Sequence, residues 1–357
     1  MPPESIVELQ VEDVAFGGNG VARHDGKAVF VPFTIDGERV SARITRQKKN
    51  FALAELREVI DPSPRRVKPR CRYFTKCGGC SYQHIDYARQ LEIKSKQVEQ
   101  TLKRVGRIAE PPMQPIVPSP AEYGYRNRIR MHIEQGAVGF YAHGSHRLID
   151  IESCPIASPE VNESLARLRS RPVYDGDYTV SENTAGKFFE QVNTAVAAEL
   201  LAHVEKLIQP GQSLLVDAYC GAGFFAKHLA GKFEKVIGIE ENEMAVAHAR
   251  QSAAPNEKYM AGDVEAHLPA AFTGEDLART TLILDPPATG ITARVSDFIL
   301  AAGPAEIIYV SCNPATLARD LALFTRSYRL LSVTPLDMFP QTAEIEAVAH
   351  LRLQEVS

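Results

Sequence analysis

The C-terminal part of the chain constrains the fold most strongly, because from Ser213 onward short, almost wholly apolar segments alternate with segments of helical spacing. Strands of a parallel sheet that helices cover on both faces have this composition. Segments that fit such strands lie at 213–219, 235–240, 258–262, 281–285, 306–311, 330–337 and 346–353. The alternation predicts a doubly wound α/β fold of the Rossmann type.

The preceding part of the chain predicts smaller, β-rich structures. Residues 5–60 alternate polar and apolar side chains in short runs separated by glycine-containing turns, which indicates a small OB-like β-barrel. Residues 82–107 have helical spacing and almost no helix breakers. Runs typical of antiparallel strands follow at 123–135, 136–144 and 146–154. We therefore expect a barrel at 1–60, a central β-rich region at 61–175 and an α/β domain at 176–357.

The net charge of -4 conceals a division of charge along the chain. Residues 1–150 hold 24 Lys and Arg against 17 Asp and Glu, whereas the remainder holds 16 against 27. The stretch 65–107 has 12 basic and 3 acidic side chains in the company of several tyrosine and phenylalanine residues. This mixture favours nucleic-acid binding over a merely solvated face. Arg126, Arg128 and Arg130 follow strand alternation, so they would line one face and meet phosphates there.

Hydropathy gives no sign of a membrane protein. No apolar run approaches the roughly 18 residues that a membrane-spanning helix needs, and the N-terminus lacks the basic-then-apolar order of a signal peptide. We therefore expect a cytoplasmic protein without a membrane partner. Because no exposed apolar helix demands a partner, we expect a monomer.

Four cysteines have the spacing of a metal site. Cys71, Cys77 and Cys80 fall within ten residues, and Cys154 follows after a long gap. Thiolates this close in sequence can surround one soft centre, and four sulfurs suit either zinc or an iron–sulfur cluster. A pair of disulfides is the alternative, but 6 Cys in 357 residues is sparse for a disulfide-stabilised chain. The spacing therefore favours a metal.

A glycine-containing turn after the first strand of the α/β part indicates a cofactor pocket. Gly221 and Gly223 allow a ligand to approach the backbone, and Glu240 ends the second strand, where an acid can hold both hydroxyls of a ribose. The third glycine of a dinucleotide fingerprint is missing, so S-adenosylmethionine fits better than a dinucleotide. Asp263 could meet the adenine amino group, or it could simply cap a helix.

Cys312 is the candidate nucleophile. It follows the fifth strand and precedes a helix that Pro314 would start, so the positive helix terminus would favour its thiolate. A buried structural cysteine is the alternative, and it is how we interpret Cys220. Thiolate addition to carbon 6 of a pyrimidine would activate carbon 5 for methylation, after which a base must remove the carbon 5 proton. Glu344 and Glu346 are the candidate bases, although both could be solvated acids.

Together these features resemble the RNA uracil-5-methyltransferases over nearly the whole chain. The motifs that carry the resemblance are the barrel, which is similar to a TRAM domain, the four cysteines, FFEQVNTAV at 188–196, DAYCGAG, DPP, SCNPATLARD and MFPQTAEIEAV. The resemblance implies a class I methyltransferase domain, a 4Fe-4S cluster on the four cysteines, Cys312 as nucleophile and Glu346 as proton acceptor. It also implies that S-adenosylmethionine contacts Gln191, Tyr219, Glu240, Asp263 and Asp285.

Phe224, Ala288 and Glu344 depart from the family pattern. Our leading hypothesis is methylation of carbon 5 of a uridine in structured RNA, with 23S ribosomal RNA favoured over transfer RNA because the barrel and the cluster occur together. One alternative is a non-catalytic iron–sulfur RNA-binding assembly factor, which Phe224 and Ala288 favour. The other is methylation of cytosine, since the same addition step serves both bases.

Overall fold

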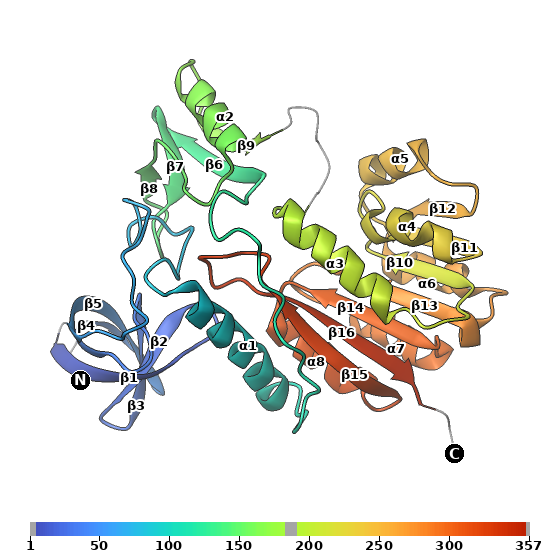
Figure 1. The fold of residues 1–357 in the computed structure, drawn as a ribbon, viewed down its shortest axis with the longest axis horizontal. Coiled ribbons are helices and arrows are strands. Elements are labelled where there is room, and N and C mark those ends of the chain that lie inside the picture. Colours follow the sequence, from blue (N-terminus) through green and yellow to red (C-terminus); the bar gives the residue numbers. More distant parts are fainter. Residues whose placement is uncertain (1–4, 183–190, 355–357) are drawn as a thin grey trace. The chain divides into compact units, whose positions relative to one another are not determined.

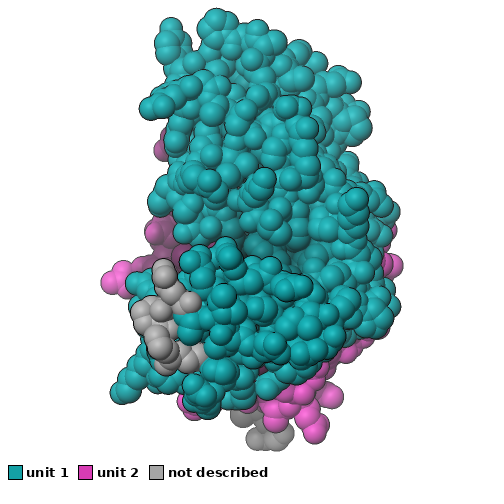
Figure 2. Space-filling view, turned by 90° about the vertical axis from the view of Figure 1, so that its left-hand side faces the viewer, with its two compact units in different colours: residues 1–97, 120–182, 339–344 teal, residues 98–119, 183–338, 345–357 magenta. Residues whose placement is uncertain are grey.

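The computed structural model describes residues 5–182 and 191–354 (Figure 1). The chain divides into two compact units (Figure 2). Unit 1 comprises residues 1–97, 120–182 and 339–344, and unit 2 comprises residues 98–119, 183–338 and 345–357. Over the described ranges, no helix combines the length and the apolar character needed to cross a membrane.

The N-terminal part of unit 1 is a closed barrel with the strand order β1-β2-β3-β5-β4. Its strands are β1 Ile6–Val14, β2 Asn19–His24, β3 Lys27–Pro32, β4 Arg39–Gln47 and β5 Phe51–Asp61. Alternate side chains, among them Val11, Val29 and Ile44, form its buried core. The barrel that the sequence predicts at 5–60 is therefore confirmed.

A buried ion pair joins the barrel to the segment that follows it. Glu38 is fully buried, and its two carboxylate oxygens accept hydrogen bonds from Arg66 Nε at 2.6 Å and Nη2 at 2.8 Å. The backbone N–H groups of Ile35 and Ser63 also donate to this carboxylate. Because the carboxylate is satisfied on all sides, the pair fixes how the chain leaves the barrel.

The second part of unit 1 is a four-stranded antiparallel sheet in the order β8-β7-β6-β9. Its strands are β6 Arg128–Glu134, β7 Ala137–Tyr141, β8 Leu148–Asp150 and β9 Gly176–Ser181. Helix α2, Pro159–Arg169, packs Val161, Leu165 and Leu168 into the same core. The three predicted strands are present, whereas the polar β9 was not predicted. The expected domain limit at 176 assigns β9 to the α/β domain, yet β9 pairs with β6 of the central sheet.

Helix α1, Tyr87–Arg104, is shorter than the predicted 82–107. It begins after Asp86, because the Asp86 carboxylate accepts the backbone N–H of Arg89 at 3.0 Å and thereby caps the first turn. Up to Gln97 the helix belongs to unit 1, where Ile93 packs beside Tyr82. Its last turns belong to unit 2, where Val98 and Leu102 are in the core.

Unit 2 is a seven-stranded sheet in the order β12-β11-β10-β13-β14-β16-β15. Its strands are β10 Leu214–Ala218, β11 Lys235–Glu240, β12 Glu257–Ala261, β13 Thr280–Leu284, β14 Glu306–Ser311, β15 Tyr328–Leu336 and β16 Glu346–Leu353. Only β16 runs against its neighbours, β14 and β15. All seven predicted strands are confirmed, and so is the doubly wound fold.

Helices cover both faces of this sheet, as its apolar strands require (Figure 1). On one face α6 Val264–Phe272, α7 Ala293–Ala302 and α8 Pro314–Phe324 pack into the main core. On the other lie α3 Thr194–Leu207, α4 Phe224–Leu229 and α5 Glu243–Gln251. Two short 3-10 helices, η1 Ala230–Lys232 and η2 Leu277–Arg279, complete the unit.

Candidate active site

The predicted cofactor and catalytic residues of the α/β part gather at one edge of the unit 2 sheet. Adjacent strands β10, β13 and β14 are parallel; their last residues Ala218 and Leu284 pair in β10 and β13, and Leu284 pairs with Tyr309, two residues before the end of β14. The residues that follow these strands therefore leave the sheet at the same edge. In an open α/β sheet this edge is where ligands bind.

The turn after β10 has an unusual backbone. Tyr219, Gly221 and Gly223 all have positive φ, at 68°, 55° and 89°. A Cβ atom at Gly223 would lie 2.7 Å from Tyr259 Oη, so only glycine fits there. Tyr219 tolerates the left-handed region at a cost of about 1–3 kcal/mol, and such strain is typical of functional sites. The turn thus exposes backbone that a ligand can approach closely.

Glu240, at the end of β11, holds this turn in place. Its carboxylate accepts hydrogen bonds from the N–H of Gly221 at 3.0 Å and from the N–H of Asn242 at 2.8 Å. The sequence predicts only a ligand-binding role for Glu240, whereas the structure adds this bond across β10 and β11. A ligand that reaches Glu240 would therefore also lie against the glycine-containing turn.

Two carboxyl groups at the strand ends have raised pKa values. Burial, together with the smaller effect of the nearby carboxylates of Asp285 and Glu240, raises the pKa of Asp217, which is fully buried in β10, to about 8. Burial also raises the pKa of Asp285, directly after β13, to about 7. Asp217 Oδ2 accepts the N–H of Ala226, which fixes the start of α4. The carboxyl groups of Asp217 and Asp285 are therefore partly protonated near neutral pH.

Asp263 and Gln191 stand at the starts of helices. Asp263 is exposed and caps α6, because its Oδ1 accepts the N–H of Glu265 at 2.8 Å; the helix-capping role that the sequence left open is thus observed. Gln191 precedes Asn193, the cap of α3. The rest of the FFEQ motif, residues 188–190, lies outside the described residues. A contact of Asp263 or Gln191 with a cofactor stays a prediction.

Cys312 and Glu346 are brought together by the antiparallel pairing of β14 and β16. Ser311 is opposite Ala347 in the last pair of this ladder, and Cys312 directly follows Ser311 while Glu346 directly precedes Ala347, so both residues adjoin the same end of the ladder. Directly opposed residues of antiparallel strands have Cα atoms about 4.5–5.5 Å apart and side chains on the same face. The 34 residues that separate the two in sequence are therefore bridged by the ladder alone.

The environments of these side chains distinguish the alternatives that the sequence left open. Cys312 is exposed in the turn before α8, so it is not a buried structural cysteine. Cys220 is buried, as expected. Of the two candidate bases, Glu346 is 4% exposed, whereas Glu344 is exposed to solvent. Only Glu346 combines burial with a position beside the thiol.

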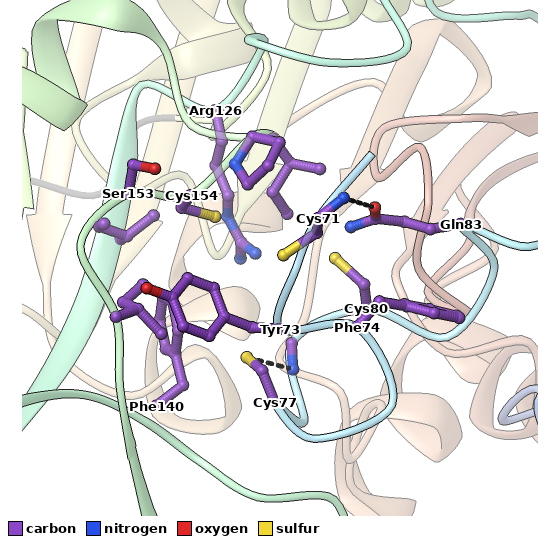
Figure 3. A pocket seen from close by; sticks show the side chains of 15 residues that line it. Cys71, Tyr73, Phe74, Cys77, Cys80, Gln83, Arg126, Phe140, Ser153 and Cys154 are labelled. Atoms are coloured by element: carbon purple, nitrogen blue, oxygen red, sulfur yellow. Dashed lines mark hydrogen bonds between the residues drawn. The ribbon is translucent and has the colours of Figure 1, made fainter. Parts of the chain in front are cut away.

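The four predicted metal ligands of unit 1 line one pocket, and their sulfur atoms face the same space (Figure 3). Three come from the loop after the barrel, and Cys154 comes from the segment between β8 and α2. All six cysteines lie within the described residues, and none forms a disulfide. Burial raises the pKa of Cys77 to about 11 and that of Cys80 to about 12. These two thiols are therefore protonated at neutral pH, and a metal would displace their protons on binding.

Polar neighbours fix the backbone of this pocket, and the sequence analysis missed them. Gln83 Oε1 accepts the N–H of Cys71 at 3.0 Å. Asn162 binds both the N–H and the carbonyl of Cys154, at 2.8 and 3.0 Å. Within the described part of the chain, no group of three or more His, Cys, Asp or Glu side chains is arranged around a single metal ion.

The comparisons with known proteins agree with this architecture. A TRAM domain model matches residues 4–56, and a model described as tRNA (uracil-5-)-methyltransferase matches residues 172–260 and 271–354. An uncharacterized RNA methyltransferase of Thermosynechococcus vestitus is 33% identical, and the match covers 97% of this chain and 98% of the relative. One from Bdellovibrio bacteriovorus is 35% identical, with coverages of 98% and 95%. The chain belongs to the RNA (uracil-5-)-methyltransferase family.

A solved structure supports the same conclusion for this methyltransferase. The crystal structure of Pyrococcus abyssi tRNA (uracil-54, C5)-methyltransferase in complex with S-adenosyl-L-homocysteine matches with a TM-score of 0.74 and 25% sequence identity. The match covers 97% of the present chain and 100% of that chain. The resemblance inferred from the separated motifs is thus confirmed, including the TRAM domain at the N-terminus.

The predicted RNA-binding arginines of this methyltransferase do not share one environment. Arg130 is exposed on β6 and pairs with Asp177 of β9 at 2.6 Å, and Arg128 stands two residues before it on the same strand. Arg126 precedes the strand and lines the cysteine pocket (Figure 3), where its Nε is buried without a hydrogen-bond partner. The expected row of three guanidinium groups is therefore reduced to two, because Arg126 turns towards the pocket.

Proposed function

We propose that the protein methylates carbon 5 of a uridine in structured RNA and uses S-adenosylmethionine as the methyl donor. The observation that carries the proposal is the β14–β16 register, which sets an exposed thiol beside a buried carboxyl group at the ligand-binding edge of the sheet. Because the carboxyl group of Glu346 is only 4% exposed, the target base must leave its stack to reach it.

The chemistry follows from the two side chains. The Cys312 thiolate forms a bond to carbon 6 of the ring, and the electron pair of the carbon 5–carbon 6 double bond becomes available at carbon 5. Carbon 5 takes the methyl group from the sulfonium of the donor, which leaves as S-adenosylhomocysteine. Glu346 then accepts the carbon 5 proton, the double bond forms again and the thiolate is expelled.

The donor would lie along the edge of the sheet between the glycine-containing turn and Cys312. Gly221 and Gly223 let it approach the backbone, and Glu240 would hold its ribose hydroxyls. Burial raises the pKa of Tyr219 to about 12, so its hydroxyl group remains a hydrogen-bond donor. Gln191, Asp263 and Asp285 are the remaining residues that we assign to this site.

Two classes of RNA are candidates. The combination of barrel and cysteine pocket favours 23S ribosomal RNA, and the basic first half of the chain suits its phosphates. The likeness to the Pyrococcus abyssi tRNA (uracil-54, C5)-methyltransferase favours transfer RNA as the second candidate.

Mapping modified nucleosides in both RNA classes tests the proposal. We expect one 5-methyluridine in RNA from cells that carry the gene, absent when the gene is deleted, and restored when the purified protein acts on the unmodified RNA with labelled S-adenosylmethionine. A 5-methylcytidine at the changed position would make the enzyme a cytosine methyltransferase. Failure to bind S-adenosylmethionine at all would leave the non-catalytic assembly factor.

We also propose that Cys71, Cys77, Cys80 and Cys154 hold a 4Fe-4S cluster. The four thiols face one pocket, and no disulfide consumes them. A zinc ion would need all four sulfurs within about 2.3 Å of one point, whereas a cluster attaches each thiolate to a different iron, so its ligands stand farther apart. Four thiols that face one space suit such a cluster, which the resemblance to the family implies in preference to zinc. When bound, it would order the loop after the barrel without taking part in methyl transfer.

Anaerobic reconstitution with iron and sulfide should produce the broad visible absorption of an iron–sulfur cluster. Cys80→Ser should lose this absorption because one of the four ligands is removed. Cys220→Ser is the control, since Cys220 is a free cysteine of unit 2 that does not belong to the set of four. Purified protein that contains stoichiometric zinc, or equal absorption in both variants, would contradict the assignment.

A further inference from the structure

Residues 339–344 form a loop that unit 1 holds tightly, and a single residue separates this loop from β16. Residues 339–344 belong to unit 1, and Ile345 then leads directly into Glu346 at the start of β16. The position of a residue between such a loop and a strand depends on the contacts of both. The contacts of the loop therefore bear on the carboxyl group that we assign as proton acceptor.

Gln341 is the most constrained residue of this loop. It is 2% exposed and has φ of 70°, a conformation that non-glycine residues adopt rarely and at a cost. Its N–H donates to Gln90 Oε1 at 3.0 Å, and its Oε1 accepts from Gln90 Nε2 at 3.0 Å. Its carbonyl accepts the N–H groups of the two residues that follow Cys80, at 3.1 and 2.9 Å. These four bonds hold the strained conformation.

The two residues before Gln341 are fixed in the same way. The carbonyl of Phe339 accepts from Lys94 Nζ at 2.9 Å, and the carbonyl of Pro340 accepts from Tyr125 Oη at 3.0 Å. Lys94 is completely buried. Burial of a cationic side chain is costly unless polar groups solvate the charge. The hydrogen bond from the buried Lys94 to a loop carbonyl therefore indicates that the position of the loop matters.

Gln90 is the side chain that joins these contacts. It is fully buried in α1, and its Nε2 also donates to the carbonyl of Ile85 at 2.8 Å. The Gln90 amide therefore forms hydrogen bonds with both the side chain and the backbone of Gln341. Gln90 and Gln341 are 251 positions apart in the sequence, so their hydrogen bonds form only in the folded structure.

We propose that Gln90 is a positioning residue for Glu346, acting through Gln341 and the loop 339–344. The inference rests on the proposed function, because it presupposes that Glu346 removes the carbon 5 proton. Gln90 does not touch the reacting atoms. Its loss should therefore impair proton removal while leaving addition of Cys312 and methyl transfer intact.

Gln97 provides a matched control on the same helix. It is also glutamine, is 3% exposed and uses its Nε2 on the carbonyls of Val14 and Ala15, both at 2.9 Å, and on Tyr82 Oη at 3.0 Å. Those carbonyls belong to the end of the first barrel strand and its turn. Gln97→Leu should thus cost stability comparable to that lost in Gln90→Leu, without a direct effect on the loop.

The test separates the two chemical steps. With ordinary uridine RNA, Gln90→Leu should slow tritium release from carbon 5 by about 10- to 100-fold, as expected for a misplaced catalytic group, and should accumulate a methylated covalent protein–RNA adduct. With RNA containing 5-fluorouridine, which has no proton to remove, the adduct should form at the rate of the unaltered protein. Gln97→Leu should show neither the slowed release nor the accumulation.

Two results would overturn the inference. One is that Gln90→Leu behaves like Gln97→Leu; the other is that Gln90→Leu slows adduct formation on 5-fluorouridine RNA as much as it slows tritium release. If Gln90→Leu does not fold, Gln341→Gly carries the same test, because glycine suits φ of 70° and lacks the side chain whose Oε1 accepts from Gln90. Failure of Glu346→Gln to accumulate adduct would instead refute the proposed function.

Discussion

Cys312→Ala should abolish methyl transfer, with a fall in rate of about 10⁴-fold or more, as for other enzymes that lose their nucleophile. The physical reason is that carbon 5 of uracil is a poor nucleophile until a group has added to carbon 6, and alanine has nothing to add. The measurement is methyl incorporation together with tritium release from RNA labelled at carbon 5 of uridine. Both should stop, because proton loss follows addition.

The same variant should fold and should still bind S-adenosylmethionine, because Cys312 is exposed and carries no part of the core. Its melting temperature and its donor affinity are therefore the internal controls. A stable adduct with 5-fluorouridine RNA should form with the unaltered protein and not with the variant. Tritium release that persists in Cys312→Ala would refute the covalent mechanism.

Glu346→Gln should trap the enzyme on its product-like intermediate. The amide matches the carboxylate in shape but cannot accept the carbon 5 proton, so turnover should fall by about 10²–10⁴-fold, the usual contribution of a general base. Addition and methyl transfer precede proton removal, so a methylated adduct with ordinary uridine RNA should accumulate. Denaturing electrophoresis with labelled methyl groups measures it directly.

Glu344→Gln is the matched control for this substitution. Glu344 stands two residues earlier in the chain and is exposed, whereas Glu346 is 4% exposed. Neutralising Glu344 should leave turnover close to that of the unaltered protein. If the two substitutions had equal effects, or if Glu346→Gln turned over normally, another group would have to be the base.

Much of the fold could be predicted because it depends on local patterns. Each strand of the unit 2 sheet is a short apolar run, and burial on both faces leaves a signal that needs no knowledge of neighbours. The start of α1 was misplaced, since the capping carboxylate of Asp86 outweighs the helical spacing of residues 82–85. Strand β9 escaped prediction because it is polar, and its pairing with β6 is what makes it a strand.

The candidate site was predictable only in part, for a related reason. Motif residues such as Cys312 and Glu346 carry recognisable chemistry, but their proximity depends on a register that no local pattern encodes. The contact of Gln90 with Gln341 left no sign in the sequence, since glutamine has no chemical signature and the partners are far apart in the chain. Arg126 was assigned to an exposed row because strand alternation cannot reveal an adjacent pocket.

The reversed direction of β16 has a consequence for how this enzyme tolerates insertions and deletions. A strand ladder alternates its faces with every residue, so removal of one residue within 347–353 would turn the acid at 346 to the opposite side of the sheet or break the pairing. Natural length variation should therefore be absent from β16 and from its ladder partner β15.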